Sequence, residues 1–330
     1  IYIAPAMNST RYTGPLRIGV TGLTNETTYY FRITAETATG ITAVSNIMPV
    51  TTGTEVPGNA LEFDGVDDGV SLPYYANLNP ASFTIASWIY VDGGTGEERP
   101  IIYSLSAFGG YQLSANTSDK FEFSVSDGSG NITSIESPES VTINQWTFIG
   151  CTFDGSKASL YINGELSASG AAAYAQNTGN MLYLAHDNVN SLYTKLRLDN
   201  TSIWDRELTQ AEIQTLMFGY LEGNESNLMA LYKYNQENST TLNDYGINGY
   251  DGTLLNMNAS EDWITSNTFT TWNGRESSDW HTKNNWSTNM YPISKNTSYH
   301  HVLIPDVTVQ PVISVDAGTR SLWLEGASEL

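Results

Sequence analysis

The acidic side chains of this 330-residue sequence do not form the pair that hydrolysis of a glycosidic bond requires. Retaining glycosidases place two carboxylates about 5 Å apart, and alternate acidic residues on one strand would achieve this because they share a face. No Glu-x-Asp-x-x-Glu series occurs. Glu97 and Glu98 are adjacent and would face opposite ways, while Glu136 and Glu139 flank Pro138 in a predicted loop.

Metal-binding histidine clusters and nucleophile motifs are missing as well. The adjacent histidines His300 and His301 would point apart on a strand, and no third ligand stands at metal spacing from them. The sequence has neither a Gly-x-Ser-x-Gly elbow nor a phosphate-binding glycine loop. We therefore predict that the chain is not an enzyme.

Aromatic and polar residues that could bind a sugar gather in the predicted loops. Aromatic rings stack on sugar faces, and Asp and Asn side chains exchange hydrogen bonds with hydroxyl groups. Loops of this composition also occur where nothing binds, so each residue is a candidate only. The candidates are Phe108, Tyr111, Tyr174, His186, Asp187, Asn188 and Tyr193.

A short acidic stretch contains Asp64, Asp67 and Asp68 on either side of Gly65. Carboxylate and carbonyl oxygens are the hard ligands that calcium prefers. Asp-Gly sequences also favour a turn without any metal. Both interpretations stay open on the sequence alone.

The charge of the chain excludes two classes of partner. It has 14 basic against 35 acidic residues, a formal net charge of −21. Such a surface repels phosphate backbones and anionic lipid, so we expect no nucleic-acid partner. No apolar run approaches the ~20 residues that cross a bilayer, so we expect no membrane insertion here. Cys151 is the only cysteine, which excludes an internal disulfide and favours a bacterial over an animal secreted protein.

Short apolar-alternating segments separated by turns indicate an all-β chain. Eight or more such strands with little helix predict a sandwich or jelly roll. One helix is legible, because Thr209 and Glu212 form a capping box and Leu208 and Ile213 a hydrophobic staple. The clearest strands are 60–63, 83–90, 101–105, 111–115, 121–125, 147–153, 158–162 and 181–185.

Three segments of the middle region resemble the laminin-G-like branch of concanavalin A-like jelly rolls in order and spacing. These are 60–70 with 83–89, 146–155 with 160–164, and 198–213. The resemblance predicts a jelly-roll sandwich over 57–265. It also predicts burial of Trp88, Trp146, Phe153 and Trp204, and a small buried side chain at Cys151.

The resemblance further implies a calcium ion where the first and last strands of the jelly roll meet. Glu62 and Asp64 share one face of the opening strand, and Asp199 stands at the family's late acidic position. We therefore name Glu62, Asp64 and Asp199 as the expected metal ligands. Where the family has a glycine-led turn after Leu184, this chain has Ala185-His186-Asp187, which favours a ligand loop.

The flanking regions resemble other modules. Residues 1–53 resemble the C-terminal half of a fibronectin type III domain, with Tyr29 at the tyrosine corner. Residues 268–330 resemble the start of a further β-rich module found in exported proteins of the Bacteroidetes type. Its tryptophans are interpreted as a structural cluster in preference to a sugar platform. Both ends of the sequence look like the interior of domains, so we expect a larger protein.

Taken together, these features predict an extracellular adhesion or carbohydrate-binding region of a large secreted bacterial surface protein, with calcium as an expected stabilising ion. Its expected partners are a polysaccharide or surface glycan and other surface proteins. Two alternatives stay open, because a fold does not determine a function. The modules are structural spacers, or they are accessory parts of an enzyme whose catalytic domain lies elsewhere.

Overall fold

The computed structural model describes the chain in two compact units, Ile1–Glu55 and Val56–Leu330, which are treated separately here. Among the described residues, no helix has the length and apolar character that crossing a membrane needs. The described residues are 28–32, 34–37, 40–44, 46–51, 58–218, 221–266, 268–288, 291–292, 301–314, 319 and 321–324.

The first unit contains two antiparallel strand pairs. Strand β1 (Thr28–Phe31) pairs with β4 (Met48–Thr51), and β2 (Thr34–Thr37) pairs with β3 (Gly40–Val44). Tyr29 lies on β1, opposite Val50. The expected fibronectin type III character of this region stays a prediction, since residues 1–27 lie outside the described part.

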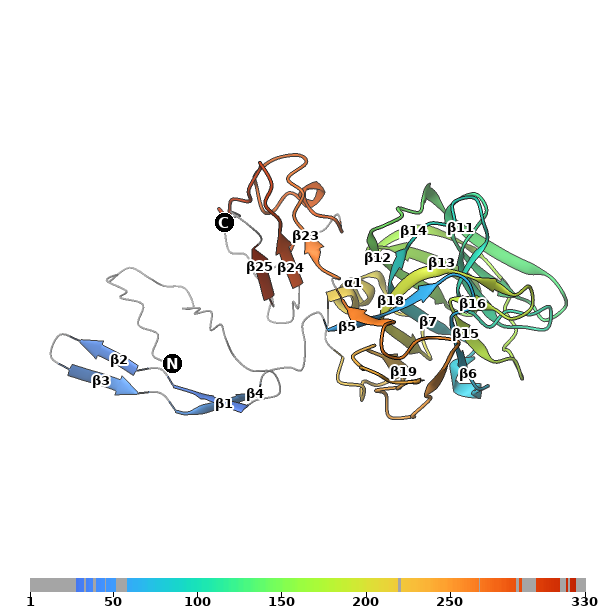
Figure 1. The fold of residues 1–330 in the computed structure, drawn as a ribbon, viewed down its shortest axis with the longest axis horizontal. Coiled ribbons are helices and arrows are strands. Elements are labelled where there is room, and N and C mark those ends of the chain that lie inside the picture. Colours follow the sequence, from blue (N-terminus) through green and yellow to red (C-terminus); the bar gives the residue numbers. More distant parts are fainter. Residues whose placement is uncertain are drawn as a thin grey trace. The chain divides into compact units, whose positions relative to one another are not determined.

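The larger unit is built on two antiparallel sheets (Figure 1). The first, named the β10 sheet, has the order β11-β10-β9-β8-β15-β6-β21-β20. Its strands are β6 (Gly69–Leu72), β8 (Arg99–Tyr103), β9 (Tyr111–Ala115), β10 (Lys120–Ser126), β11 (Ile132–Ser140), β15 (Leu182–Leu184), β20 (Thr241–Leu242) and β21 (Gly252–Leu255).

The second sheet, named the β12 sheet, has the order β14-β13-β12-β7-β18-β5-β22, and β19 pairs with β18 outside this path. Its strands are β5 (Asn59–Asp64), β7 (Phe83–Val91), β12 (Trp146–Phe153), β13 (Lys157–Ile162), β14 (Glu165–Ala171), β18 (Lys195–Trp204), β19 (Leu228–Tyr232) and β22 (Trp263–Thr265). A short 3-10 helix, η1 (Ala76–Leu78), follows β6. The predicted all-β class and jelly-roll sandwich are confirmed.

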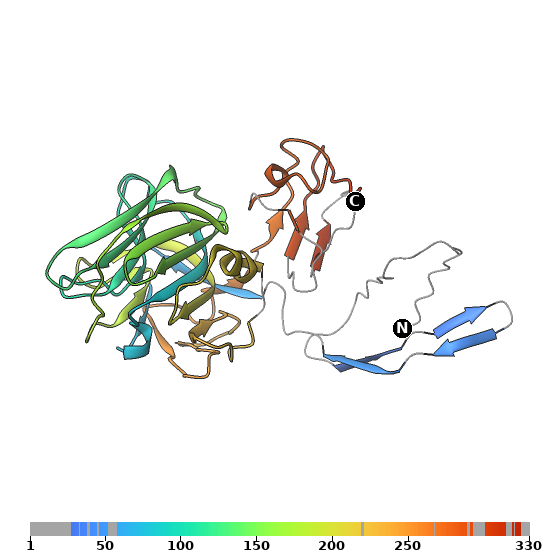
Figure 2. The same cartoon turned by 180° about the vertical axis from the view of Figure 1, so that it is seen from behind.

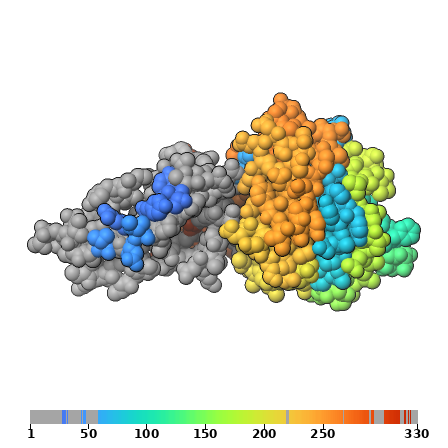
Figure 3. All heavy atoms as spheres, turned by 90° about the horizontal axis from the view of Figure 1, so that it is seen from below, coloured from blue at the N-terminus to red at the C-terminus, as the bar shows by residue number. Residues whose placement is uncertain are grey.

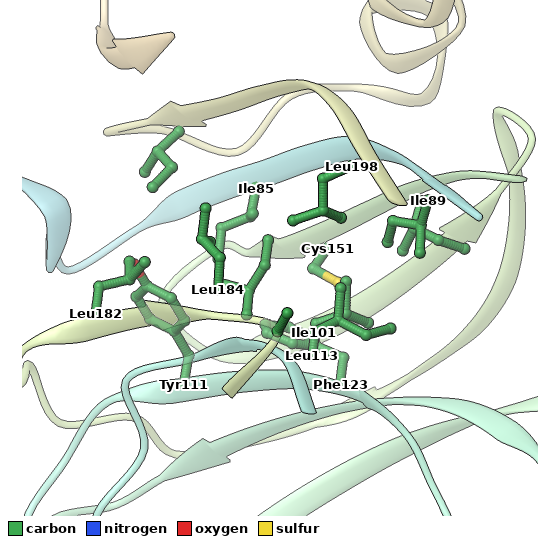
Figure 4. Close-up of a cluster of buried hydrophobic side chains, with 14 of the residues drawn as sticks. Ile85, Ile89, Ile101, Tyr111, Leu113, Phe123, Cys151, Leu182, Leu184 and Leu198 are labelled. Carbon is green, nitrogen blue, oxygen red and sulfur yellow. The ribbon is translucent and has the colours of Figure 1, made fainter. Parts of the chain in front are cut away.

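The core lies between the two sheets because alternate residues of each strand point inwards. Figure 4 shows Ile85 and Leu198 of the β12 sheet facing Leu113 and Phe123 of the β10 sheet. Cys151 lies among them with none of its surface exposed. Burial raises the pKa of its thiol well above the usual range, so it serves as a small apolar side chain.

The strands after residue 228 complete both sheets and hold the jelly roll closed. Strand β21 pairs with β6, and β22 pairs with β5. Figure 3 shows this late segment, in orange, beside the opening strands, in cyan. This late segment therefore contributes strands to both layers of the sandwich.

Helix α1 (Gln210–Phe218) covers the outer face of the β12 sheet (Figure 2). Trp88 and Trp204, predicted to be buried, are 4% and 6% exposed and lie in this apolar cluster with Ile213. The indole N–H of Trp88 donates to the carbonyl of Met217 at 3.1 Å. Trp146 and Phe153 are 7% and 2% exposed, so all four burial predictions are confirmed.

The last described segment holds a parallel three-stranded sheet. Strands β23 (Thr270–Thr271), β24 (His301–Ile304) and β25 (Ser321–Leu324) lie side by side in chain order, and η2 (Lys283–Asn285) lies between β23 and β24 in sequence. The tryptophan cluster here consists of Trp272, Trp280 and Trp286, which are at most 1% exposed. They form a structural core, as the sequence predicted.

Candidate functional site

The outer face of the β10 sheet, opposite the core, carries a continuous polar surface. The strand pairing places Tyr183, Tyr103 and Gln112 in one row, which continues to Ser124 and Ser134. The inward-facing neighbours of these residues are apolar and buried in the core, so these side chains must point outwards. We name this surface, together with the row described next, the polar face.

The second row of the polar face contains two glutamates. Ser114 lies opposite Glu122 on β10, and Glu122 lies opposite Glu136 on β11. Glu98, just before β8, also lies at the polar face. The side-chain amide of Gln112, from the first row, donates to Glu98 Oε1 at 3.2 Å. Three carboxylates from different strands therefore stand on one sheet face.

Neutral donors hold these carboxylates in place. Asn116 Nδ2 donates to Glu122 Oε2 at 3.0 Å and to Glu136 Oε1 at 2.9 Å. The hydroxyls of Ser124 and Ser134 bond Glu122 Oε1 at 3.0 and 3.1 Å. Amide and hydroxyl groups orient the carboxylates without cancelling their charge.

Asn116 can serve this purpose because its turn fixes its orientation. Its Oδ1 accepts the backbone N–H groups of Ser118 and Lys120 at 3.0 and 3.1 Å, as is typical of an Asx turn between two strands. The amide NH₂ group is thereby directed at the two glutamates. The sequence Asn116–Lys120 thus builds the hairpin and organises the polar face together.

An aromatic edge borders the polar face on the side of β15. Ala185, with φ 58°, adopts a left-handed conformation and turns the chain into a hairpin of β16 (His186–Asp187) and β17 (Leu192–Tyr193). The His186 and Tyr193 rings stack at 4.4 Å, and Tyr183 meets His186 edge-on at 5.2 Å. Tyr183 and Tyr193 are both partly exposed.

Two pKa shifts mark where the polar face excludes water. Burial raises the pKa of Tyr103 to about 12, and the neighbouring Asp187 carboxylate adds to this effect. Burial also raises the pKa of Glu98, with a further contribution from Glu122. The Tyr103 hydroxyl therefore remains a hydrogen-bond donor at neutral pH.

The sequence-predicted ligand residues are brought together only in part. His186, Asp187, Asn188 and Tyr193 share one hairpin beside the polar face. Asn188 is exposed, and Asp187 mainly fixes the hairpin turn by accepting from Val189 N at 2.7 Å and Asn190 Nδ2 at 2.6 Å.

The structure corrects two of the other ligand candidates. Tyr111 is fully buried on β9, and its hydroxyl donates to Leu78 O at 2.8 Å. Tyr174 packs against Phe83 and Phe153 at ring distances of 5.2 and 5.3 Å. Tyr111 belongs to the core, and the half-buried Tyr174 packs against it. Phe108 is 80% exposed, as a loop ligand would require.

The expected calcium ligands do not converge. Glu62 and Asp64 share a face, as predicted, but Glu62 Oε1 is bound by Arg197 at 2.7 Å. Asp64 lies opposite Lys195, four positions before Asp199 on β18. Asp199 is fully buried and accepts the Ser266 hydroxyl at 2.6 Å. Glu62, Asp64 and Asp199 therefore do not form the single group of ligands that the sequence predicted.

Among the described residues, one acidic group has the compactness of an ion site, and it consists of Asp64, Asp67 and Asp68 within 4.8 Å of one another. Its carboxylates also form the turn. Asp64 Oδ1 accepts Val66 N at 2.7 Å, and Asp68 Oδ2 accepts Asp64 N at 2.9 Å. Hydrogen bonds within the turn account for the arrangement, so the calcium expectation stays a prediction.

The polar face was not predicted from the sequence. Its glutamates and serines come from separate strands, and only the pairing order places them side by side. The alternation of β10, with Phe121, Phe123 and Val125 inwards, already indicated that Glu122 and Ser124 face outwards. The alternation shows on which side of β10 each residue lies, but it does not show which residues of other strands lie next to it.

The comparisons with known proteins agree with this architecture. Residues 64–214 match the laminin G model of the concanavalin A-like lectin/glucanases superfamily. A candidate carbohydrate-binding protein from Bacteroides ovatus ATCC 8483 is similar in structure, with 15% identity, a TM-score of 0.51, and coverage of 74% of this chain and 72% of its own. No curated protein matches the sequence.

Two further solved structures are more distant. A native heptameric SAP-like pentraxin from Limulus polyphemus has 12% identity and a TM-score of 0.39, covering 49% of this chain and 82% of its own. The receptor binding domain of botulinum neurotoxin C/D mosaic serotype has 16% identity and a TM-score of 0.39, covering 60% and 48%. The larger unit of this chain therefore has a jelly-roll sandwich fold, and its residues 64–214 are similar to the laminin G branch of the concanavalin A-like superfamily.

Proposed function

We propose that this chain is a carbohydrate-binding region of a large protein exported to a bacterial surface, and that the polar face with its aromatic edge receives the glycan. The observation that carries the proposal is the combination of partly exposed aromatic rings with fixed hydrogen-bonding groups on one sheet face. Sugars offer an apolar ring face and several hydroxyls, so they need both kinds of contact.

The difference between the two outer sheet faces supports this location. The outer face of the β12 sheet is apolar and is covered by α1 through Ile213 and Met217. The outer face of the β10 sheet instead carries polar side chains, of which Ser134 and Glu136 are exposed. A ligand can therefore reach the polar face directly along β11, while Ser114, Ser124 and Tyr103 at its centre are buried.

The chemistry of the polar face favours binding over catalysis. Glu122 accepts hydrogen bonds from Asn116, Ser124 and Ser134, so its oxygens are engaged in organising the surface. Hydrolysis would need one carboxyl free to donate a proton and a second free to attack or to activate water. The proposal therefore assigns no reaction to this face.

The surface location rests on composition and on analogy. The net charge of −21 keeps a protein soluble and separate from nucleic acid. The Bacteroides ovatus protein of similar fold is itself a candidate carbohydrate-binding protein, and that likeness supports the fold and suggests the ligand class. Spacer modules and accessory modules of an enzyme are the competing functions.

A glycan-binding experiment tests the proposal. The complete 330-residue chain, displayed multivalently, would be applied to a glycan array and to insoluble polysaccharides. We expect modest binding that Tyr193→Ala weakens roughly two- to tenfold by removing the exposed ring. Tyr193→Phe should retain binding because it keeps the ring.

The matched control is Tyr245→Ala, which removes a 39% exposed tyrosine from the loop after β20. It should leave glycan binding unchanged. If the protein shows a normal thermal transition but binds no glycan of a broad panel, the spacer function is favoured. Binding that ignores Tyr193 would place the ligand elsewhere on the chain.

A further inference from the structure

The polar face has a pronounced imbalance of charge. Glu98, Glu122 and Glu136 stand on it, and Asp187 lies in the adjoining hairpin. The strands that carry these residues, β8 to β11 and β15 to β17, contain only two basic residues besides His186, which are Arg99 and Lys120. The face therefore carries more negative than positive groups.

Neither basic residue of these strands forms a salt bridge with the glutamates among the described residues, although the charge of Arg99 partly counteracts the effect of burial on the pKa of Glu98 and Lys120 lies on the Glu122 side of β10. Arg99 is only 3% exposed and donates to Asp119 Oδ1 at 2.6 Å and to Gly93 O at 2.9 Å. Its guanidinium is thus already paired at the end of the sheet. Lys120 lies at the start of β10, outside the bonds that fix Glu122 and Glu136.

The donors that surround the glutamates are neutral. The amide of Asn116 bridges Glu122 and Glu136, and two serine hydroxyls complete the environment of Glu122. An arrangement of this kind fixes carboxylates at set positions while leaving their charge available to an approaching cation. Glu136 is exposed, so the charge is accessible from solvent.

The aromatic edge gives the same surface a second, uncharged mode of contact. Tyr183 and Tyr193 present partly exposed rings at the β15 side of this surface, three to four strands (roughly 14–19 Å) from Glu122 on β10 and Glu136 on β11, a span that an oligosaccharide can bridge. A ligand that matches the whole surface needs a sugar ring for the tyrosines and positive charge for the glutamates. Aromatic rings also attract cations at their faces.

We propose that the polar face selects glycans rich in amino sugars whose amino groups are free and protonated, and that it rejects sulfated and uronic-acid glycans. This refinement rests on the carbohydrate-binding function proposed above. An ammonium group on each sugar would meet the carboxylates of Glu122 and Glu136, and charge-assisted hydrogen bonds are about twice as strong as neutral ones. Like charges would repel an anionic chain.

The expected effect is moderate because Glu136 is exposed to solvent and Glu122 is only half-buried. Each exposed ion pair contributes roughly 0.2–1 kcal/mol, so two pairs should favour the charged sugar by about two- to thirtyfold at low salt. The preference should shrink between about 0.05 M and about 0.5 M salt, since the Debye length falls over this range. Contacts to the tyrosine rings should be insensitive to salt.

The test compares two oligosaccharides of equal length, one of glucosamine and one of N-acetylglucosamine, by titration calorimetry with the complete chain. A pH of about 6 keeps the amino groups of the glucosamine oligomer protonated. We expect tighter binding of the glucosamine oligomer, a loss of this preference in Glu136→Gln, and no binding of polygalacturonate. Glu136→Gln is chosen because the side chain is exposed and its amide oxygen can still accept from Asn116.

The matched control is Glu222→Gln, an equal charge change in an exposed loop following α1. A similar loss of preference in both variants would trace binding to the overall charge of −21 and overturn the site. Equal affinity for the two oligomers, still dependent on Tyr193, would overturn the charge preference and leave carbohydrate binding intact. Absence of binding to both, and to a broad glycan panel, would overturn the refinement and the proposed function together.

Discussion

The carboxyl group of Asp68 is held in an environment that favours its neutral form. It is 5% exposed, and burial raises its pKa to about 6, with further contributions from Asp64, Asp262 and Asp67. The folded state therefore holds this proton more tightly than the unfolded state does. The stabilisation is complete below the unfolded pKa of 3.8 and is lost as the pH rises through about 6.

This pKa shift predicts that two Asp→Asn variants change the stability of the fold in opposite directions. At pH 7, Asp68→Asn should stabilise the fold by about 1 kcal/mol, or a few degrees in Tm, because an amide keeps an acceptor for Asp64 N without the charge. Asp127→Asn should destabilise, since bonds from Asn131 and Ser129 lower the pKa of Asp127 and stabilise its charge. Thermal melts of the complete chain at several pH values measure both. Equal effects of the two variants would contradict the prediction.

The same melts test the calcium expectation. If Asp64, Asp67 and Asp68 bound calcium, about 1 mM calcium should raise Tm relative to chelator at pH 7. The difference should shrink below about pH 6, because Asp68 must lose its proton to coordinate the ion. Identical melts with calcium and chelator would remove the ion from the description of this turn.

Single residues show what the sequence could and could not reveal. The burial of Trp88 and Trp204 was predictable because both stand in apolar strand segments. Tyr111 was misplaced in a loop because it begins a strand directly after Gly110, which has φ 97°. The hydrogen bonds of Asp199 to Ser266 and Thr268 could not be predicted, because these partners lie more than 60 residues away in sequence.

At the scale of elements, the N-terminus of α1 is stabilised by a capping box and by an ion pair. Glu212 Oε2 accepts Thr209 N at 2.8 Å, and Glu212 N donates to Thr209 Oγ1 at 3.3 Å, which confirms the capping box. Arg206 also binds Glu212 through both carboxylate oxygens, at 3.1 and 2.8 Å. The Arg206 side chain is the main reason that the pKa of Glu212 is lowered to about 2.

We predict that Thr209→Ala lowers the stability of the whole sandwich by about 1 kcal/mol. The cost should reach the global unfolding transition because α1 packs on Trp88 and Phe148 of the β12 sheet. Thr209→Ser should retain most of the stability, since its hydroxyl can still accept from Glu212 N. Denaturant titrations of the three proteins give the comparison, and a loss in Thr209→Ser as large as in Thr209→Ala would argue against the cap.

Elements differ in how far the sequence determines them. Strands β12 and β13 were predicted from the alternating segments 147–153 and 158–162, and α1 was predicted from its cap. The parallel sheet β23–β25 was predicted only as β-rich, because each strand pairs with a segment far along the chain, such as Thr270 with Val302. Pairing across that distance depends on packing of Trp272 and Trp286, which local patterns do not encode.

At the scale of the whole molecule, strand order creates the polar face. Tyr183 on β15 lies beside Tyr103 on β8, which are 80 residues apart in sequence. Alternation predicts which side of a strand each residue occupies, but the neighbour of a strand follows from jelly-roll topology. The sandwich was therefore predictable from the sequence, while the placement of Glu122, Glu136 and the aromatic edge on one sheet face needed the fold.

The net charge of −21 is also a property of the whole chain. Several basic residues are already used in ion pairs, including Lys195 with Asp92 and Arg197 with Glu62. Many acidic groups therefore repel one another across the folded surface, and the unfolded chain relieves this repulsion by expanding.

We predict that added NaCl stabilises the fold. Raising the salt from about 0.02 M to about 0.5 M at pH 7.5 reduces the Debye length several-fold, which screens repulsion between distant carboxylates more than it weakens close ion pairs. Tm should rise by a few degrees, and the rise should be smaller near pH 4.5, where many carboxylates carry protons. Thermal melts across a salt series at both pH values give the answer. A fall in Tm with salt at pH 7.5 would show that pairs such as Arg197 with Glu62 outweigh the net repulsion, and would shift the account of stability from overall charge to local contacts.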